Sequence, residues 1–272
     1  MNVATLNSPP AGKKLPDVGR GHQKNRLFRF GWVLILLAGR QVNAEELQQK
    51  LVGDIGLGAY YTPSIVRGNS DKTAVLPYAE FEYGKLFSRV DTLGIKTLKL
   101  GYGDLELVGR ISQDGFNTGS PLLQGLYKRD TSIPLGIGTL QVTPVGAIMA
   151  NAFHDINKSQ GNIAEVIYAG EIDLQRVTLY PLAGAEYQTK EYVRYYYGVS
   201  PQEAANSLYA AYRPGSSLNG LVGLIAEINL SNAYYLNFYA RRKWLGDAIQ
   251  SSPIVNQKYT DTAYFSISYR YK

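Results

Sequence analysis

The sequence predicts an all-β protein: a transmembrane, antiparallel up-and-down β-barrel of twelve strands, with a short helix in one long outer loop. Three observations support this fold class. Many stretches alternate between apolar and polar residues, an export signal precedes them, and all 22 tyrosines follow that signal. A soluble periplasmic β-protein would also alternate, so it is the alternative fold that the pattern leaves open.

The first 44 residues have the pattern of a secretory signal peptide with a long positively charged n-region. Arg26 and Arg29 precede a ten-residue apolar run, residues 30–39, which is too short to span a bilayer as a helix. The small residue Ala44 then precedes Glu45, and we predict cleavage between these two. The expected domains are therefore a signal peptide over residues 1–44 and a barrel over residues 45–272.

The net charge of +6 belongs to this leader and not to the barrel. Residues 1–44 hold seven of the 28 basic residues but one of the 22 acidic ones, so the rest of the chain carries 21 of each. Nucleic-acid binding needs a persistent basic surface. The neutral remainder therefore argues against a nucleic-acid partner.

Alternation along the predicted strands assigns each side chain to the lipid or to the lumen. In the last strand Phe265, Ile267 and Tyr269 alternate with Ser266 and Ser268. The polar face carries charges in strand after strand, as a wet barrel interior would. We expect the following charged residues to point into the lumen: Arg110, Glu165, Glu171, Asp173 and Arg241.

The count of twelve strands rests on the rule that short turns and long loops alternate between the two ends of such a barrel. We expect short turns at Gly84, 101–103, near Gly138, near Arg176 and at 231–232. Dividing residues 86–100 near 91–94 satisfies the rule throughout. An unbroken 86–100, with the short 131–137 strand omitted, gives the alternative of ten strands. Five prolines are an objection to either strand number, because proline cannot donate a hydrogen bond to a neighbouring strand. We expect them at strand ends or bulges: Pro63, Pro77, Pro134, Pro144 and Pro181.

The longest outer loop contains a signal for a short helix. Ser200, Pro201 and Glu203 form a capping box with proline at the first helical position, which predicts a helix from about Pro201 to Ser207. That helix either folds over the barrel mouth or merely orders the loop. Tyrosines cluster around it, among them Tyr196, Tyr197 and Tyr212. They are candidates to stack on a sugar or on lipopolysaccharide, and tyrosines of the membrane interface are the alternative.

The sequence shows no catalytic, cofactor or metal motif. The barrel region holds one histidine, His154, in a predicted loop without a nucleophile motif. The chain has no cysteine, which excludes thiolate-bound metals. We expect no enzyme activity and no cofactor.

Five stretches, which span most of the chain after the leader, resemble one family, the MltA-interacting protein / OmpV-like outer-membrane proteins. They are residues 56–63, 75–84, 123–130, 195–204 and 245–255. The last two, with Tyr212 following the fourth, are the most specific. The resemblance implies an integral barrel in the outer membrane of a Gram-negative bacterium, in contact with lipid and lipopolysaccharide. Residues 131–153 look shorter than is usual for the family, which puts the strand pair there in doubt.

For function the resemblance implies a structural scaffold linked to murein-synthesising and murein-hydrolysing enzymes. The expected partners are a lytic transglycosylase and a bifunctional penicillin-binding protein. A porin-like channel for small solutes, or a surface adhesin, is the alternative. Short periplasmic turns oppose the scaffold, and inward charges favour the channel.

Overall fold

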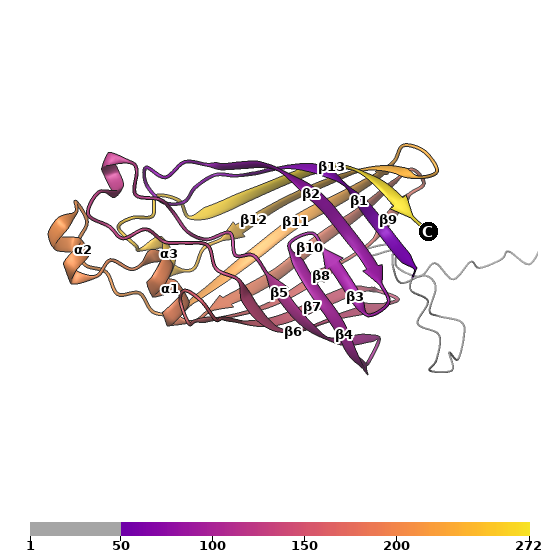
Figure 1. Ribbon diagram of the computed structural model, residues 1–272, viewed down its shortest axis with the longest axis horizontal. Coiled ribbons are helices and arrows are strands. Elements are labelled where there is room, and N and C mark those ends of the chain that lie inside the picture. The colour runs from indigo at the N-terminus through magenta and orange to yellow at the C-terminus, as the bar shows by residue number, and fades with distance from the viewer. Residues whose placement is uncertain (1–49) are drawn as a thin grey trace, which may run out of the picture.

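The computed structural model describes residues 50–272, which form one closed antiparallel barrel (Figure 1). The predicted signal peptide and its cleavage site, Ala44 and Glu45, lie outside the described residues. Strands pair in chain order, and the pairs β13–β1 and β10–β11 close the ring. The strands are β1 Leu51–Thr62, β2 Lys72–Tyr83, β3 Leu86–Arg89, β4 Thr92–Leu100, β5 Gly103–Arg110, β6 Pro134–Thr143, β7 Gly146–Asp155, β8 Asn162–Ala169, β9 Ile172–Leu174, β10 Val177–Gln188, β11 Ser217–Asn229, β12 Tyr234–Trp244 and β13 Tyr259–Tyr271.

The barrel has twelve strands because β8 and β9 are two parts of one strand, both paired with β10 in a single register. Pro181 causes the interruption between them. Gly170 donates its N–H to the Pro181 carbonyl, but proline has no N–H to return a second bond. The ten-strand alternative is wrong, because residues 86–100 divide into β3 and β4 at residues 90–91.

Short turns lie at one end of the barrel and long loops at the other. In outer-membrane barrels the short turns face the periplasm, so we call the two ends the periplasmic end and the outer end. Gly84 and Gly101 adopt positive φ angles of 59° and 58° in two of the periplasmic turns, a conformation that glycine adopts readily. The start of β1 and the C-terminus both lie at the periplasmic end (Figure 1).

Three sequence expectations in the middle of the chain were wrong. Gly138 lies within β6, and the turn comes later, at residues 144–145. The doubted strand pair of residues 131–153 is present as β6 and β7, ten residues each. His154 lies at the end of β7 rather than in a loop, with its Nδ1 2.8 Å from Asn162 Oδ1. Periodicity is weak here because Gly136, Gly138 and small residues break the alternation.

The remaining prolines fit the barrel. Pro63 directly follows β1, Pro134 begins β6, and Pro144 lies in a periplasmic turn. Pro77 lies inside β2, where its missing N–H faces no neighbouring strand, as described below.

The two faces of the wall follow the predicted alternation. Exposed side chains on the outside are predominantly apolar and aromatic, among them Leu57, Phe265, Phe238 and Leu224. Inward positions hold buried polar groups, among them Asp54, Glu165, Ser266 and Arg270. This is the arrangement of a barrel surrounded by lipid.

Candidate functional site

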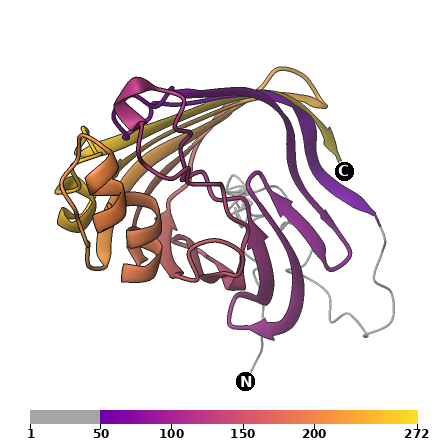
Figure 2. The same cartoon turned by 60° about the vertical axis from the view of Figure 1, so that its left-hand side comes forward.

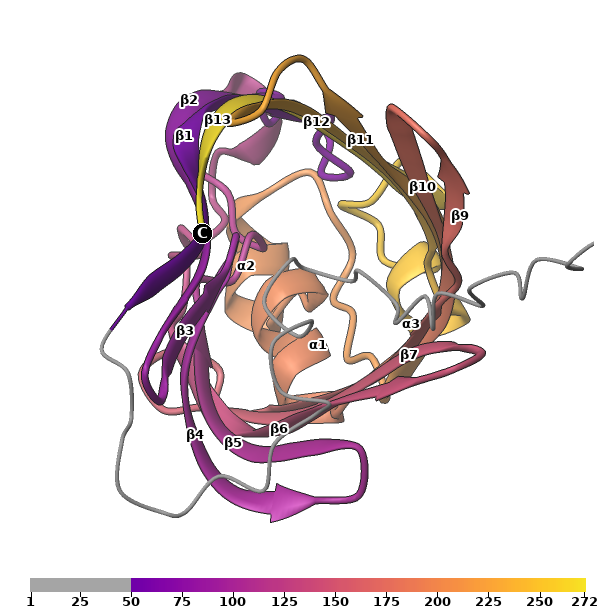
Figure 3. The same ribbon diagram turned by 90° about the vertical axis from the view of Figure 1, so that its right-hand side faces the viewer.

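The outer loops fold together into a compact structure that closes the outer end of the barrel (Figures 1 and 2). We call this structure the cap; it comprises residues 63–71, 111–133, 189–216 and 245–258. It contains a 3₁₀-helix, η1 Pro121–Leu123, and three α-helices, α1 Lys190–Tyr197, α2 Pro201–Asn206 and α3 Asp247–Gln250. Seen along the barrel from the periplasmic end, α1 and α2 lie inside the outline of the wall (Figure 3).

A hydrophobic core holds the cap together and joins it to the barrel. Leu123, Val193 and Ile254 come from three different loops and are fully buried in it. Phe153 and Ile163, at the outer ends of β7 and β8, belong to the same cluster. The cap is therefore packed onto the inner wall of the barrel and does not hang freely above the mouth.

Asp114 anchors α1 over the mouth. Its two carboxylate oxygens accept hydrogen bonds from the hydroxyls of Tyr192 and Tyr197, each at 2.7 Å. Ser112 Oγ lies 2.8 Å from the Tyr192 hydroxyl. Burial, and then the nearby Asp114 carboxylate, raises the pKa of both tyrosines well above the usual range, so both remain neutral donors.

The predicted capping box is present, with its helix over Pro201–Asn206. Ser200 Oγ accepts from the Glu203 N–H at 3.2 Å, and Glu203 Oε2 accepts from the Ser200 N–H at 2.9 Å. The other carboxylate oxygen, Oε1, receives Arg129 at 2.7 Å and the Tyr127 N–H at 2.9 Å. The Arg129 and Glu203 side chains are only 9% and 2% exposed. Glu203 thus joins α2 to the loop that precedes β6.

This network predicts that the cap loosens in acid. Burial by itself would raise the pKa of Glu203, but hydrogen bonds from Ser200, Tyr127 and Arg129 outweigh it and hold the pKa below the usual 4.5. A lowered folded-state pKa stabilises the cap fully above pH 4.5, and that stabilisation is lost as the pH falls through the folded-state value.

We expect hydrogen exchange of residues 201–206 to be slow at pH 6 and to lose protection below pH 4.5 once intrinsic rates are corrected for. In Glu203→Gln, protection should already be weaker at pH 6 and should change less with pH. Identical profiles for the two proteins would contradict this role.

The predicted loop tyrosines belong to the cap and are not girdle residues. Tyr196 and Tyr197 are buried in its core, and the Tyr196 hydroxyl donates to the Asp130 carbonyl at 3.3 Å. The Tyr212 hydroxyl donates to the Ala248 carbonyl at 2.9 Å and so links two loops. Tyr196 and Tyr197 are therefore buried in the cap and do not face the membrane interface, since helix α1 turns them toward the barrel interior.

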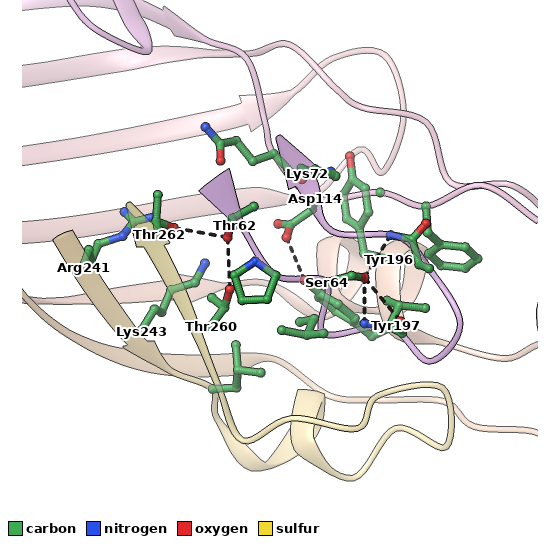
Figure 4. Close-up of a pocket in the computed structure, with 18 residues that line it drawn as sticks. Thr62, Ser64, Lys72, Asp114, Tyr196, Tyr197, Arg241, Lys243, Thr260 and Thr262 are labelled. Atoms are coloured by element: carbon green, nitrogen blue, oxygen red, sulfur yellow. Dashed lines mark hydrogen bonds between the residues drawn. The ribbon is translucent and has the colours of Figure 1, made fainter. Parts of the chain in front are cut away.

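A small chamber of about 80 Å³ lies between the cap and the inner wall (Figure 4). The side chains of Lys72, Arg241 and Lys243 line it, together with Thr62, Thr260 and Thr262. Lys243 pairs with Glu186 at 3.1 Å. Within residues 50–272 neither Lys72 nor Arg241 has a carboxylate oxygen within 4.0 Å. Asp114, which accepts from the two tyrosines, is the acidic residue of the same lining. With three basic side chains and one carboxylate in its lining, the chamber carries an excess of positive charge below the cap.

Ion pairs join nearby strands on the inner wall of the barrel below the chamber. Arg110 pairs with Glu165, and Arg89 with Glu106 at 2.6 Å. Near the periplasmic end Arg270 binds Asp54 at 2.7 Å and Glu227 at 2.8 Å. Sequence reasoning missed most of these partners, although each lies on the inward face that alternation identifies.

The predicted lumen charges therefore have different surroundings. Arg110, Glu165 and Arg241 lie inside the barrel. Glu171 is half-buried between β8 and β9. Asp173 lies near the periplasmic rim, exposed, where it accepts a hydrogen bond from the Gln175 N–H at 2.9 Å. The strand alternation assigns the face of the wall but does not tell how far from the rim a residue lies.

Within residues 50–272 no group of three or more His, Cys, Asp or Glu residues is placed to hold a metal ion. No helix of the same residues is long and apolar enough to cross a membrane.

A twelve-stranded barrel with an apolar outer surface, a charged interior and a cap over one end defines an integral outer-membrane protein. The family model of the MltA-interacting protein MipA matches residues 55–271. The chain belongs to this family.

Relatives of the chain are outer-membrane proteins of Gram-negative bacteria. The putative outer membrane protein YiaT of Escherichia coli K12 is 26% identical over 221 residues, which cover 80% of this chain and 90% of that protein. Outer membrane protein OmpV of Vibrio cholerae is 30% identical over 53% of this chain and 54% of its own. The MltA-interacting protein of E. coli K12 is 24% identical over 57% of this chain and 63% of its own.

Proposed function

We propose that this protein is a closed, non-conducting barrel that acts by binding rather than by catalysis, as an outer-membrane anchor for a lytic transglycosylase. The observation that carries the proposal is the closure of the outer mouth: the cap has its own hydrophobic core and packs onto the inner wall. The ion pair of Arg110 with Glu165, which joins β5 to β8 on the inner wall below the cap, supports the same conclusion. A passive pore would need an open water path instead.

The family supports the choice of partner. The matching model and one relative carry the name MltA-interacting protein, and MltA is a lytic transglycosylase. A bifunctional penicillin-binding protein is the second partner that the sequence resemblance implies.

The periplasmic rim offers a surface for such a partner despite its short turns. Tyr102 in the β4–β5 turn is 71% exposed, and Val145 in the β6–β7 turn is 75% exposed. The Gln141 side chain accepts from the Tyr102 N–H and donates to the Leu100 carbonyl, both at 2.8 Å. These two hydrogen bonds hold the β4–β5 turn rigid. Little conformational entropy is therefore lost when a partner docks on Tyr102.

The test is capture of a purified lytic transglycosylase by the barrel in detergent micelles. We expect the native protein to retain the enzyme and the double variant Tyr102→Ala, Val145→Ser to retain much less. Tyr127→Ala removes an exposed tyrosine from the cap and serves as the matched control, with native binding expected. Absence of capture by the native protein would exclude the anchor role for that enzyme.

A gated channel is the second candidate, and the cationic chamber lined by Lys72 and Arg241 favours it. Planar-bilayer recordings discriminate between the two functions. The closed-barrel proposal expects no steady conductance from the native protein, whereas anion-selective openings would support the channel.

A further inference from the structure

The wall of the barrel is incomplete in its outer half, beside β2. Strand β3 has four residues, and it pairs only with the periplasmic third of the twelve-residue β2, residues 80–83 (Figure 1). One further bond joins the Val90 N–H to the Ala79 carbonyl. Beyond Ala79 the remaining residues of β2 have a strand neighbour on the β1 side alone.

The direction of the free backbone groups follows from strand geometry. Alternate residues direct their N–H and C=O to alternate sides of a strand. The backbone carbonyl of Ala79 points toward β3. The backbone polar groups of Pro77, Val75 and Thr73 therefore point to the same side. Within residues 50–272 these three have no hydrogen-bond partner on that side. This open edge has two free N–H groups and three free carbonyls.

The open edge lies at the depth of the lipid chains. Val75 is beside Ala59, which is beside the outward-facing Phe265. Tyr61, next to Thr73, has its hydroxyl on Asp71 at 2.8 Å and marks the outer interface. Val75 and Pro77 are therefore below the head groups and within the apolar band.

Pro77 makes this edge a poor template for a further strand. Proline at a strand edge removes a ladder donor and blocks strand addition. It also lowers the cost of leaving the edge in hydrocarbon, because one unpaired N–H is absent. Pro77 thus disfavours a peptide strand as the partner of this edge.

An inward-facing apolar side chain of β2 is exposed beside the opening. Leu76 shares the lumen face with Tyr78 and Glu80, yet it is 46% exposed. On the far side of the opening runs the cap segment 111–116, which Gln113 ties to Lys72 and Tyr60. Leu76 thus offers an apolar contact to a hydrocarbon chain that enters between β2 and residues 111–116.

A polar groove lies directly above the opening. It has a volume of about 600 Å³ and lies between residues 68–72 and residues 115–131. Lys72, the first residue of β2, lines both the groove and the chamber, and Lys128 lines the groove opposite. Asn69, Ser70, Asn117 and Ser120 supply amide and hydroxyl groups. Asp71 and Asp130 also line it, and Lys128 pairs with Asp130 at 2.7 Å, so Lys72 is the lysine of the lining that has no carboxylate partner within residues 50–272. The groove therefore offers an anionic head group one unpaired cation, Lys72, beside polar side chains.

We propose that the barrel opens laterally to the outer leaflet between the outer half of β2 and residues 111–116. The opening holds an acyl chain of an anionic phospholipid, with Leu76 against the chain and Lys72 at the head group in the groove.

Fluorescence quenching by lipid tests the opening. The chain has no native cysteine, so single cysteines can carry a bimane label. The label is placed at Leu76→Cys, at Ile225→Cys on the lumen face of the unbroken wall, and at Leu224→Cys on the lipid side. The protein is folded into vesicles of phosphatidylcholine and phosphatidylglycerol with brominated acyl chains.

We expect the brominated lipid to quench the fluorescence of the label at position 76 as strongly as that of the label at position 224. The label at position 225 should keep its fluorescence. Equal protection of positions 76 and 225 would overturn the lateral opening. Quenching at position 76 by aqueous iodide and not by bromolipid would also overturn it, because water would then fill the gap.

The head-group assignment has its own readout. After detergent extraction from the same vesicles, native protein should retain phosphatidylglycerol in excess over phosphatidylcholine. Lys72→Gln should lose that excess, and Lys99→Gln, an exposed lysine near the periplasmic end, should keep it. An unchanged excess in Lys72→Gln would show that Lys72 does not select the anionic head group.

Discussion

Replacing Arg270 with alanine is expected to lower the free energy of unfolding of the barrel by about 3–5 kcal/mol, the cost of leaving a buried charge without its partner. Arg270 bonds Asp54 through Nε and one terminal nitrogen, both at 2.7 Å, and Glu227 at 2.8 Å. All three side chains are buried. The guanidinium also lies 3.3 Å from the centre of the Tyr235 ring. Its removal leaves two carboxylates unpaired in the lumen.

Urea titration of folding into vesicles, followed by the heat-dependent gel shift of folded barrels, measures this loss. Arg242→Ala is the matched control, because Arg242 also pairs with an aspartate of the neighbouring strand, Asp261 at 2.8 Å, but on the exposed outer face. It should cost less than about 1 kcal/mol. Arg270→Met combined with Asp54→Asn and Glu227→Gln should recover much of the loss, since no lone charge remains. Equal costs for the two single arginine variants would contradict the prediction.

Replacing Asp114 with alanine should open the cap while leaving the barrel folded. The buried hydroxyls of Tyr192 and Tyr197 lose their acceptor, at about 1–3 kcal/mol each. Every 1.4 kcal/mol is a tenfold change in population. We therefore expect the open cap to become more populated by about tenfold or more.

Limited proteolysis and hydrogen exchange over residues 189–216 measure cap opening, and the heat-dependent gel shift reports on the barrel. Asp173→Ala removes an exposed aspartate from the periplasmic rim and should leave both readouts unchanged. Unaltered exchange of α1 in the Asp114 variant would show that the hydrophobic core alone keeps the cap closed.

Local patterns were enough to predict the wall of the barrel. Side chains alternate with a period of two along any strand, so the facing of Phe265, Glu165 or Arg241 follows from position in the chain alone. The capping box at Ser200 and Glu203 was predictable for the same reason, because both of its hydrogen bonds lie within four residues.

Turn positions were less predictable where glycine blurs the pattern. Gly138 resembles a turn residue, yet it continues β6 because Asn151 and Glu106 on the two adjacent strands pair with it. Pairing between strands outweighs local preference at such a position.

The sequence by itself determined that this chain is built of strands with one apolar and one charged face, because those properties follow from the period of its segments, and it favoured twelve strands over ten from the spacing of the turns. Only the tertiary structure decided that the cap closes the outer mouth, since Arg129 meets Glu203, and Asp114 meets Tyr197, from loops more than 70 residues apart. The same holds for the open edge of β2. It exists because β3 is shorter than its neighbour, and the mismatch becomes visible only when the strands are placed side by side.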